Sequence, residues 1–105
     1  MIGPHQHLVL VGMMGVGKTT VAKVVAERLG RPVVDTDHAI EASTGRTVRD
    51  IFSTDGEDAF RSIESQVLGE ALASPTPSVI AGAGGVVLRP SNREALRSSG
   101  ARVVW

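Results

Sequence analysis

A glycine-rich segment near the start of the chain carries residue types suited to holding phosphate groups. It reads Gly12-Met13-Met14-Gly15-Val16-Gly17-Lys18-Thr19 and fits the pattern G-x-x-x-x-G-K-[ST] at every fixed position. Glycines let backbone N–H groups turn toward a phosphate, Lys18 adds positive charge near the β and γ groups, and the Thr19 hydroxyl can bind Mg²⁺. The segment therefore predicts a site for a nucleoside triphosphate.

The residues around this segment favour that interpretation over a chance glycine-rich turn. The short apolar run 7–11 comes directly before it, and apolar residues recur at helical spacing through 18–29 after it. Gly30 and Pro32 are suited to end that helix. The pattern requires a strand before the loop and a helix after it, and the positive end of the helix adds to the anion site.

Two carboxylates, Asp35 and Asp37, stand two residues apart at the end of the apolar segment 33–35. Mg²⁺ bound to phosphates takes one or two protein carboxylates, so a single aspartate beside Thr19 is the expected complement. The other can accept a hydrogen bond or a proton from a substrate hydroxyl. Asp37 also precedes a helical pattern and could serve as its N-cap.

Two further positions allow both a structural and a functional interpretation. Arg61 stands beside Phe60 on the apolar face of a helical pattern, so it either reaches solvent or points at an anion, and position alone favours solvent. The segment 82–85, Gly-Ala-Gly-Gly, is either a tight turn or a second set of N–H groups near the ligand. The three histidines show no metal-ligand spacing, so we expect His5, His7 and His38 to be surface or strand residues.

Composition limits the class of protein. The 105 residues suffice for one domain, and eleven basic against eleven acidic residues leave no net charge to favour nucleic acid or an anionic membrane. No apolar run approaches a membrane span, and the first residues lack the pattern of a signal peptide. The chain has no cysteine, which agrees with a reducing compartment. We expect a cytoplasmic protein that binds neither nucleic acid nor membrane.

Apolar runs alternate with helical patterns along the whole chain, as is typical of a parallel sheet covered by helices. The predicted strands are 7–12, 33–35, 78–82 and 101–105, and the predicted helices are 18–29, 37–43, 47–52, 57–73 and 90–98. Thr47 to Asp50 resembles a capping box with Asp in place of Glu. The fold class expected is α/β, with three α/β/α layers.

Taken in order, four segments make the chain resemble shikimate kinases. They are G-M-M-G-V-G-K-T-T, V-V-D-T-D-H-A-I-E-x-x-T-G-R, D-I-F-S-T-D-G-E-D-A-F-R-S-I-E and V-I-A-G-A-G-G-V-V-L, followed by P-x-x-R-x-x-L. The resemblance runs from about residue 8 to 105, and D-G-E-x-x-F-R is far more specific than the phosphate loop. It implies a P-loop fold like that of nucleoside monophosphate kinases, with about four of the family's five strands present. It also implies transfer of the ATP γ-phosphate to the 3-hydroxyl of shikimate, and we expect the protein to be a monomer.

The resemblance assigns a role to each matching residue. The phosphate-binding residues would be Gly15, Val16, Gly17, Lys18, Thr19 and Thr20. Lys18 would neutralise charge in the transition state, while Thr19, with Asp35 through water, would hold Mg²⁺. Asp37 would bind the shikimate hydroxyls and orient the attacking oxygen. Arg61 would pair with the shikimate carboxylate, and Gly84 would offer its backbone N–H to the substrate.

The chain departs from the family in two respects. Ala83 replaces the first glycine of a G-G-G segment, which costs about 1 kcal/mol or more if that position needs a positive φ. Family members also continue through a lid, an adenine-contacting loop, a further strand and a final helix. We therefore expect residues 1–105 to be a single P-loop kinase domain that is incomplete at its C-terminal end.

Two other functions fit the residues less well than that of a shikimate kinase. One is a non-catalytic module that binds a nucleotide or shikimate. The other is a P-loop kinase of another small hydroxylated metabolite, such as gluconate or a nucleoside monophosphate. The segment D-G-E-D-A-F-R argues against this last alternative.

Overall fold

A computed structural model of the chain describes residues 6–11, 15–82 and 89–104, with the backbone alone for 15–19. The strands are β1 (Leu8–Leu10), β2 (Val33–Asp35), β3 (Val79–Ala81) and β4 (Arg102–Val104). The helices are α1 (Gly15–Leu29), α2 (Thr36–Thr44), α3 (Val48–Asp55), α4 (Glu57–Ala73) and α5 (Pro90–Ser99). Each predicted strand and helix is present, and the long helix has the bounds predicted for it. None of the helices described is long and apolar enough to cross a lipid bilayer.

The four strands form one parallel sheet in the order β2-β3-β1-β4. β1 lies inside the sheet, where Leu8 pairs with Val79 on one side and with Arg102 on the other. All its residues are buried, which agrees with an unbroken apolar run rather than an alternating one. The expected α/β fold with a parallel sheet is confirmed.

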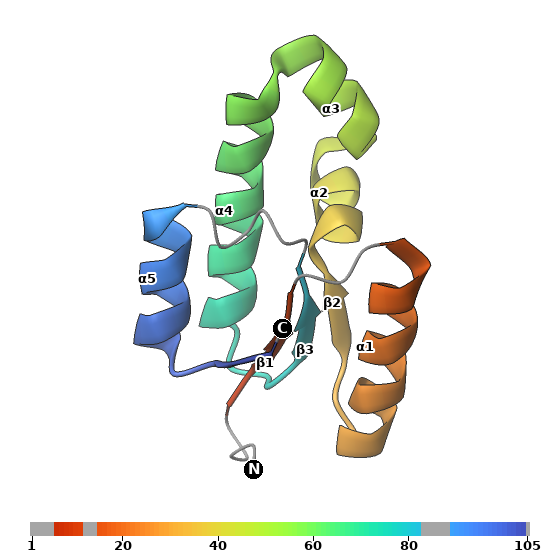
Figure 1. The fold of residues 1–105 in the computed structure, drawn as a ribbon, viewed down its shortest axis with the longest axis vertical. Coiled ribbons are helices and arrows are strands. Elements are labelled where there is room, and N and C mark those ends of the chain that lie inside the picture. The colour runs from red at the N-terminus through yellow and green to blue at the C-terminus, as the bar shows by residue number, and fades with distance from the viewer. Residues whose placement is uncertain (1–5, 12–14, 83–88, 105) are drawn as a thin grey trace.

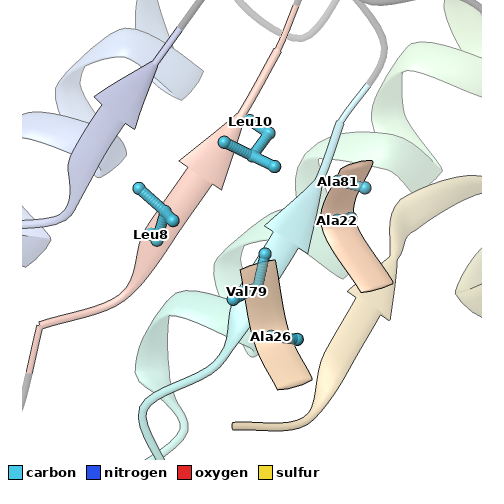
Figure 2. Close-up of a cluster of buried hydrophobic side chains, with 6 residues drawn as sticks. All are labelled: Leu8, Leu10, Ala22, Ala26, Val79 and Ala81. Carbon is cyan, nitrogen blue, oxygen red and sulfur yellow. The ribbon is translucent and has the colours of Figure 1, made fainter. Parts of the chain in front are cut away.

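Helices cover both faces of this sheet, α1 on one side and α4 with α5 on the other (Figure 1). The alternation of side chains along β1 separates two clusters. Leu8 and Leu10 pack with Ala22 and Ala26 of α1, as Figure 2 shows. Val9 points to the opposite face and packs in a cluster with Leu68 of α4 and Leu96 of α5. The small alanines let α1 approach the strands closely.

A third apolar cluster lies among helices α2, α3 and α4, where they extend past the carboxyl ends of the strands (Figure 1). It contains Ile40, Ile51, Phe60 and Val67. None of its buried residues comes from a strand, so the described helices form their own small core beside the sheet. This core holds the part of the chain that carries Arg61.

Two helices extend three residues past one of their predicted ends. α1 begins at Gly15 instead of residue 18, and α3 continues to Asp55 instead of residue 52. Gly56 ends α3 with φ +93° and ψ 169°, a conformation that favours glycine, and α4 begins at the next residue. The predicted N-cap of α3 is confirmed, since the Thr47 hydroxyl accepts a hydrogen bond from the Asp50 N–H at 3.0 Å. The Asp50 carboxylate accepts bonds from Arg46 and Thr54.

Candidate active site

The parallel sheet brings the predicted site segments to one edge. Leu10 and Asp35, the last residues of β1 and β2, both pair with Ala81 at the end of β3. The chain leads from these strand ends into the phosphate segment, α2 and the segment 82–85 respectively. Ligands of open α/β sheets bind at the carboxyl ends of the strands, so the topology supports a site here.

Part of the predicted site lies outside the described residues. This holds for Gly12 to Met14, Ala83 and Gly84, and for the side chains of Val16, Lys18 and Thr19, while Gly15 and Gly17 are described by their backbone. The backbone of 15–19 belongs to the first turns of α1, and Thr20 is exposed there. The roles assigned to these residues stay predictions.

Asp35, not Asp37, is the N-cap of α2. The Oδ1 atom of Asp35 accepts hydrogen bonds from the backbone N–H groups of Asp37 at 3.0 Å and His38 at 3.2 Å. Asp35 has extended backbone angles as the last residue of β2, and the helix begins at the very next position. The alternative that Asp37 caps the helix is therefore wrong. No loop separates strand from helix, so the cap falls two residues earlier.

The start of α2 is tied firmly to the sheet. Thr36 is fully buried and its hydroxyl donates to the carbonyl oxygen of Ala81 at 3.3 Å. Asp37 follows in the first helical turn, where the helix dipole favours a negative charge. Its side chain is partly buried, and its Oδ1 atom is inaccessible to solvent. Both aspartates are thus held on backbone that is anchored to the strand ends.

An open cavity of about 540 Å³ is lined by residues of α1, β2 and α2. Its lining residues are Lys23, Val33, Asp35, His38 and Glu41. Asp35 therefore borders solvent-accessible space in addition to capping α2. The cavity has room for a hydrated ion beside this carboxylate.

Arg61 lies against aromatic rings and is mostly shielded from solvent. Its side chain is 19% exposed, and its Cζ atom lies 5.3 Å from the Phe60 ring centroid and 5.9 Å from that of Phe52. The two rings are themselves in tilted contact at 4.5 Å. The solvent-facing placement that the position alone favoured is wrong, because Phe52 and Phe60 enclose the guanidinium. Aromatic faces attract and orient such a cation.

Glu64 is the partner of Arg61. It has no exposed side-chain surface, and its Oε1 atom accepts a hydrogen bond from Arg61 Nη1 at 3.0 Å. Glu57 lies farther, at 3.9 Å, and is 68% exposed. Sequence reasoning missed Glu64, although a carboxylate among the apolar positions of a helix, three residues after an arginine, is a recognisable signal. The buried carboxylate of Glu64 therefore orients the Arg61 guanidinium.

Arg46, in the connection between α2 and α3, was also missed. Its Nε atom donates to Asp50 at 2.7 Å and its Nη1 atom to Asp55 at 2.7 Å. The hydrogen bond from Arg46 lowers the pKa of Asp50, and hydrogen bonds to Asp55 and Asp50 raise the pKa of Arg46. These ion pairs connect both ends of α3 to the end of α2.

The histidines are not alike. His7 is buried just before β1, where its Nδ1 atom accepts a hydrogen bond from the backbone N–H of Ser78 at 3.1 Å and its Nε2 atom lies 3.1 Å from the carbonyl oxygen of Ser74. His38 is exposed on α2, and His5 lies outside the described residues. His7 thus joins the start of β1 to the segment before β3 and has a structural role.

Comparison with known proteins decides the family. A family model described as shikimate kinase matches residues 14–105. The chain belongs to the shikimate kinase family. A shikimate kinase of Symbiobacterium thermophilum is 56% identical over 99 residues, which are 94% of this chain and 56% of that protein. The chain spans about half the length of the curated relatives that it matches.

Solved structures agree with this family. Shikimate kinase from Acinetobacter baumannii, in complex with shikimate, matches with a TM-score of 0.85 and 43% identity over 93% of this chain and 54% of that one. A gluconokinase from Sinorhizobium meliloti matches less well, with a TM-score of 0.59 and 25% identity over 96% of this chain and 55% of that one. The fold is that of the shikimate kinases.

Proposed function

We propose that this chain carries the phosphate- and substrate-binding part of a kinase that transfers the γ-phosphate of ATP to the 3-hydroxyl of shikimate. The products are shikimate 3-phosphate and ADP. The observation that carries the proposal is the family match over residues 14–105, which includes the end of the phosphate segment, both aspartates and Arg61. In this proposal residues 1–105 belong to one P-loop kinase domain, which is a monomer in the cytoplasm.

Binding of ATP rests on the phosphate segment at the start of α1. Backbone N–H groups of Gly15 to Thr20 surround the phosphates, aided by the positive end of the helix. Lys18 places its charge beside the transferred group, where negative charge spreads over oxygen atoms in the transition state. Because little covalent chemistry is needed from the protein, positioning and charge account for most of the rate.

Mg²⁺ fits the donor set at the end of β2. Asp35 accepts two backbone N–H bonds through one oxygen atom, an arrangement that fixes the direction of its carboxylate. Asp35, through water, and the Thr19 hydroxyl would hold the ion, which needs only one or two protein carboxylates beside phosphate oxygens. When bound, Mg²⁺ neutralises phosphate charge.

Binding of shikimate rests on Asp37, Arg61 and the backbone of Gly84. Arg61 has a planar fork that suits a carboxylate, and its contacts with Glu64 and Phe52 hold that fork in place. Asp37 accepts hydrogen bonds from the substrate hydroxyls and orients the 3-hydroxyl oxygen for attack, taking its proton as the phosphoryl group transfers. The family match covers these two side chains and Gly84.

The test is a rate of ADP formation from ATP and Mg²⁺ that depends on added shikimate. We expect such a rate for the wild-type chain, no shikimate-dependent rate for Lys18→Ala, and no response to gluconate. The Lys18→Ala preparation also controls for contaminating kinases. ATP binding measured by calorimetry, without any shikimate-dependent rate, would instead favour a non-catalytic binding module. A response to gluconate in place of shikimate would favour another metabolite kinase.

A further inference from the structure

We propose that Arg46 is a positioning residue for the shikimate carboxylate site: it clamps α3 against the end of α2 and so holds the Phe52 ring against the Arg61 guanidinium. This inference rests on the proposed function. Arg46 itself is placed outside the substrate contacts and acts through α3 and Phe52.

The clamp is a single guanidinium that reaches both ends of a short helix. Arg46 follows Gly45, the residue that ends α2 with φ +70°. Its Nε atom donates to Asp50 in the first turn of α3, and Nη1 and Nη2 donate to the two Oδ atoms of Asp55, the last residue of α3, at 2.7 and 3.4 Å. Lysine, with one compact ammonium group, cannot reproduce this fork.

α3 is short and packs mainly through one apolar face. It is eight residues long, and Ile51 is its only buried residue in the structure described, with Val48 and Phe52 partly buried against the same cluster. Other polar ties to α2 are local, such as the Val48 N–H bond to Glu41 Oε2 at 2.9 Å at the start of the helix. An isolated helix of this length is unstable in water. The clamp therefore contributes to the position of the far end of α3, at Asp55.

The position of α3 bears directly on Arg61. Phe60 and Glu64 belong to the same helix as Arg61, so their contacts with it follow from α4 alone. Phe52 belongs to α3, and its ring reaches Arg61 only when α3 lies against α4. Gly56, with φ +93°, joins the two helices directly and is a natural pivot between them. Releasing Arg46 lets α3 turn about Gly56 and withdraw Phe52 from the guanidinium.

The experiment measures shikimate and ATP affinities of the 105-residue chain by calorimetry for Arg46→Lys and Arg46→Ala. The shikimate Kd is expected to rise about five- to tenfold in both, since a loosely held guanidinium loses preorganisation. The ATP Kd should stay within twofold. Arg97→Ala is the matched control, because it removes an exposed arginine–glutamate pair on α5. That control should change neither Kd.

A double-mutant cycle tests the route of the effect. Phe52→Leu keeps an apolar side chain but removes the ring that faces Arg61. If Arg46 acts through Phe52, adding Arg46→Lys to Phe52→Leu changes the shikimate Kd by less than twofold. The two effects are then non-additive, although Arg46 contacts Asp50 and Asp55 and Phe52 contacts Arg61. Full additivity of the two effects overturns the proposal.

The remaining outcomes separate this inference from the proposed function. If the wild-type chain binds shikimate and Arg46→Lys binds it equally well, the inference is wrong and the proposed function stands. Equal losses of shikimate and ATP affinity also overturn it, since they indicate general unfolding. A wild-type chain that binds ATP but not shikimate overturns the proposed function, and this inference with it.

Discussion

Glu64 places a carboxylate where water cannot reach it, with the Arg61 guanidinium 3.0 Å away. Removing a carboxylate from water costs several kcal/mol, and only a well-placed partner offsets that cost. Arg61 keeps 19% of its side chain exposed, so its remaining donors can face a ligand while one is held by Glu64. In the proposed function, this pair orients Arg61 for binding the substrate carboxylate.

We predict that Glu64→Ala lowers the free energy of unfolding by roughly 1–3 kcal/mol, because it removes a buried hydrogen-bonded partner of a charged group. The same variant should weaken shikimate binding, because Arg61 loses its orientation. Denaturant unfolding and calorimetry measure the two effects.

The matched control for that prediction is Glu57→Ala, which removes the other carboxylate near Arg61. That pair is 3.9 Å long and its glutamate is 68% exposed. Its loss should change stability by about 0.5 kcal/mol or less. Equal effects of the two substitutions would show that burial of Glu64 is unimportant.

At the level of whole elements, a pair of substitutions can separate the N-cap of α2 formed by Asp35 from the role proposed for Asp35 in holding Mg²⁺. Asp35→Asn retains a side-chain oxygen for the N-cap of α2, so stability should change by only a few tenths of a kcal/mol. Asp35→Ala removes the cap bonds to Asp37 and His38 and should cost about 0.5–2 kcal/mol. Both variants should need more Mg²⁺ for ADP formation. Thermal unfolding and a Mg²⁺ titration test this, and an unchanged Mg²⁺ requirement in both would exclude Asp35 from the metal site.

Ion pairs of Arg46 with Asp50 and Asp55 hold the two ends of α3, and the pKa of Asp50 is a measure of the first pair. Arg46 lowers the pKa of Asp50 in the folded protein. Because the carboxyl pKa is lower in the folded than in the unfolded protein, the ion pair stabilises the fold at pH values above the ordinary aspartate pKa of about 3.9. This contribution is lost as the pH falls through the lower pKa of the folded state. We therefore predict that Arg46→Ala raises the pKa of Asp50 toward its ordinary value, as followed by NMR of the side-chain carboxyl. An Asp50 pKa that does not move would mean that the ion pair is absent in solution.

At the scale of the molecule, stability should fall from the inner strands to β4. Ile80 on β3 is fully buried, whereas Val104 on β4 is 42% exposed, and β4 pairs only with β1 in the sheet described. Ile80→Ala should cost about 2–5 kcal/mol through lost burial and a cavity. Val104→Ala should cost about 0.5 kcal/mol or less. Denaturant unfolding measures both.

Hydrogen exchange provides an independent check of the same gradient. Amides of β4 should exchange faster than those of β1 and β3, since edge strands open locally at lower free energy. Uniform protection across the sheet would contradict this.

Local patterns predicted the elements well and their junctions less well. The helix at 57–73 follows from an apolar face interrupted by polar residues and ended by prolines, and all these signals lie within the segment. The N-cap of α2 was misplaced because β2 runs into the helix without a loop, and that join depends on Thr36 bonding to Ala81 across the sheet. The placement of Arg61 was misjudged from its position, since the Phe52 ring that covers it belongs to another helix.

By itself, the sequence determined the alternation of strands and helices, the phosphate segment and the family. Periodicity, cap chemistry and motif spacing depend only on residues that are close together in the sequence. Only the tertiary structure decided that Asp35 caps α2, that Glu64 is buried against Arg61, and that Arg46 joins both ends of α3. These features depend on which side chains become buried when the helices pack together. Burial and electrostatic pairing are properties of the folded arrangement, which a local pattern such as the spacing of Arg61 and Glu64 can indicate but does not determine.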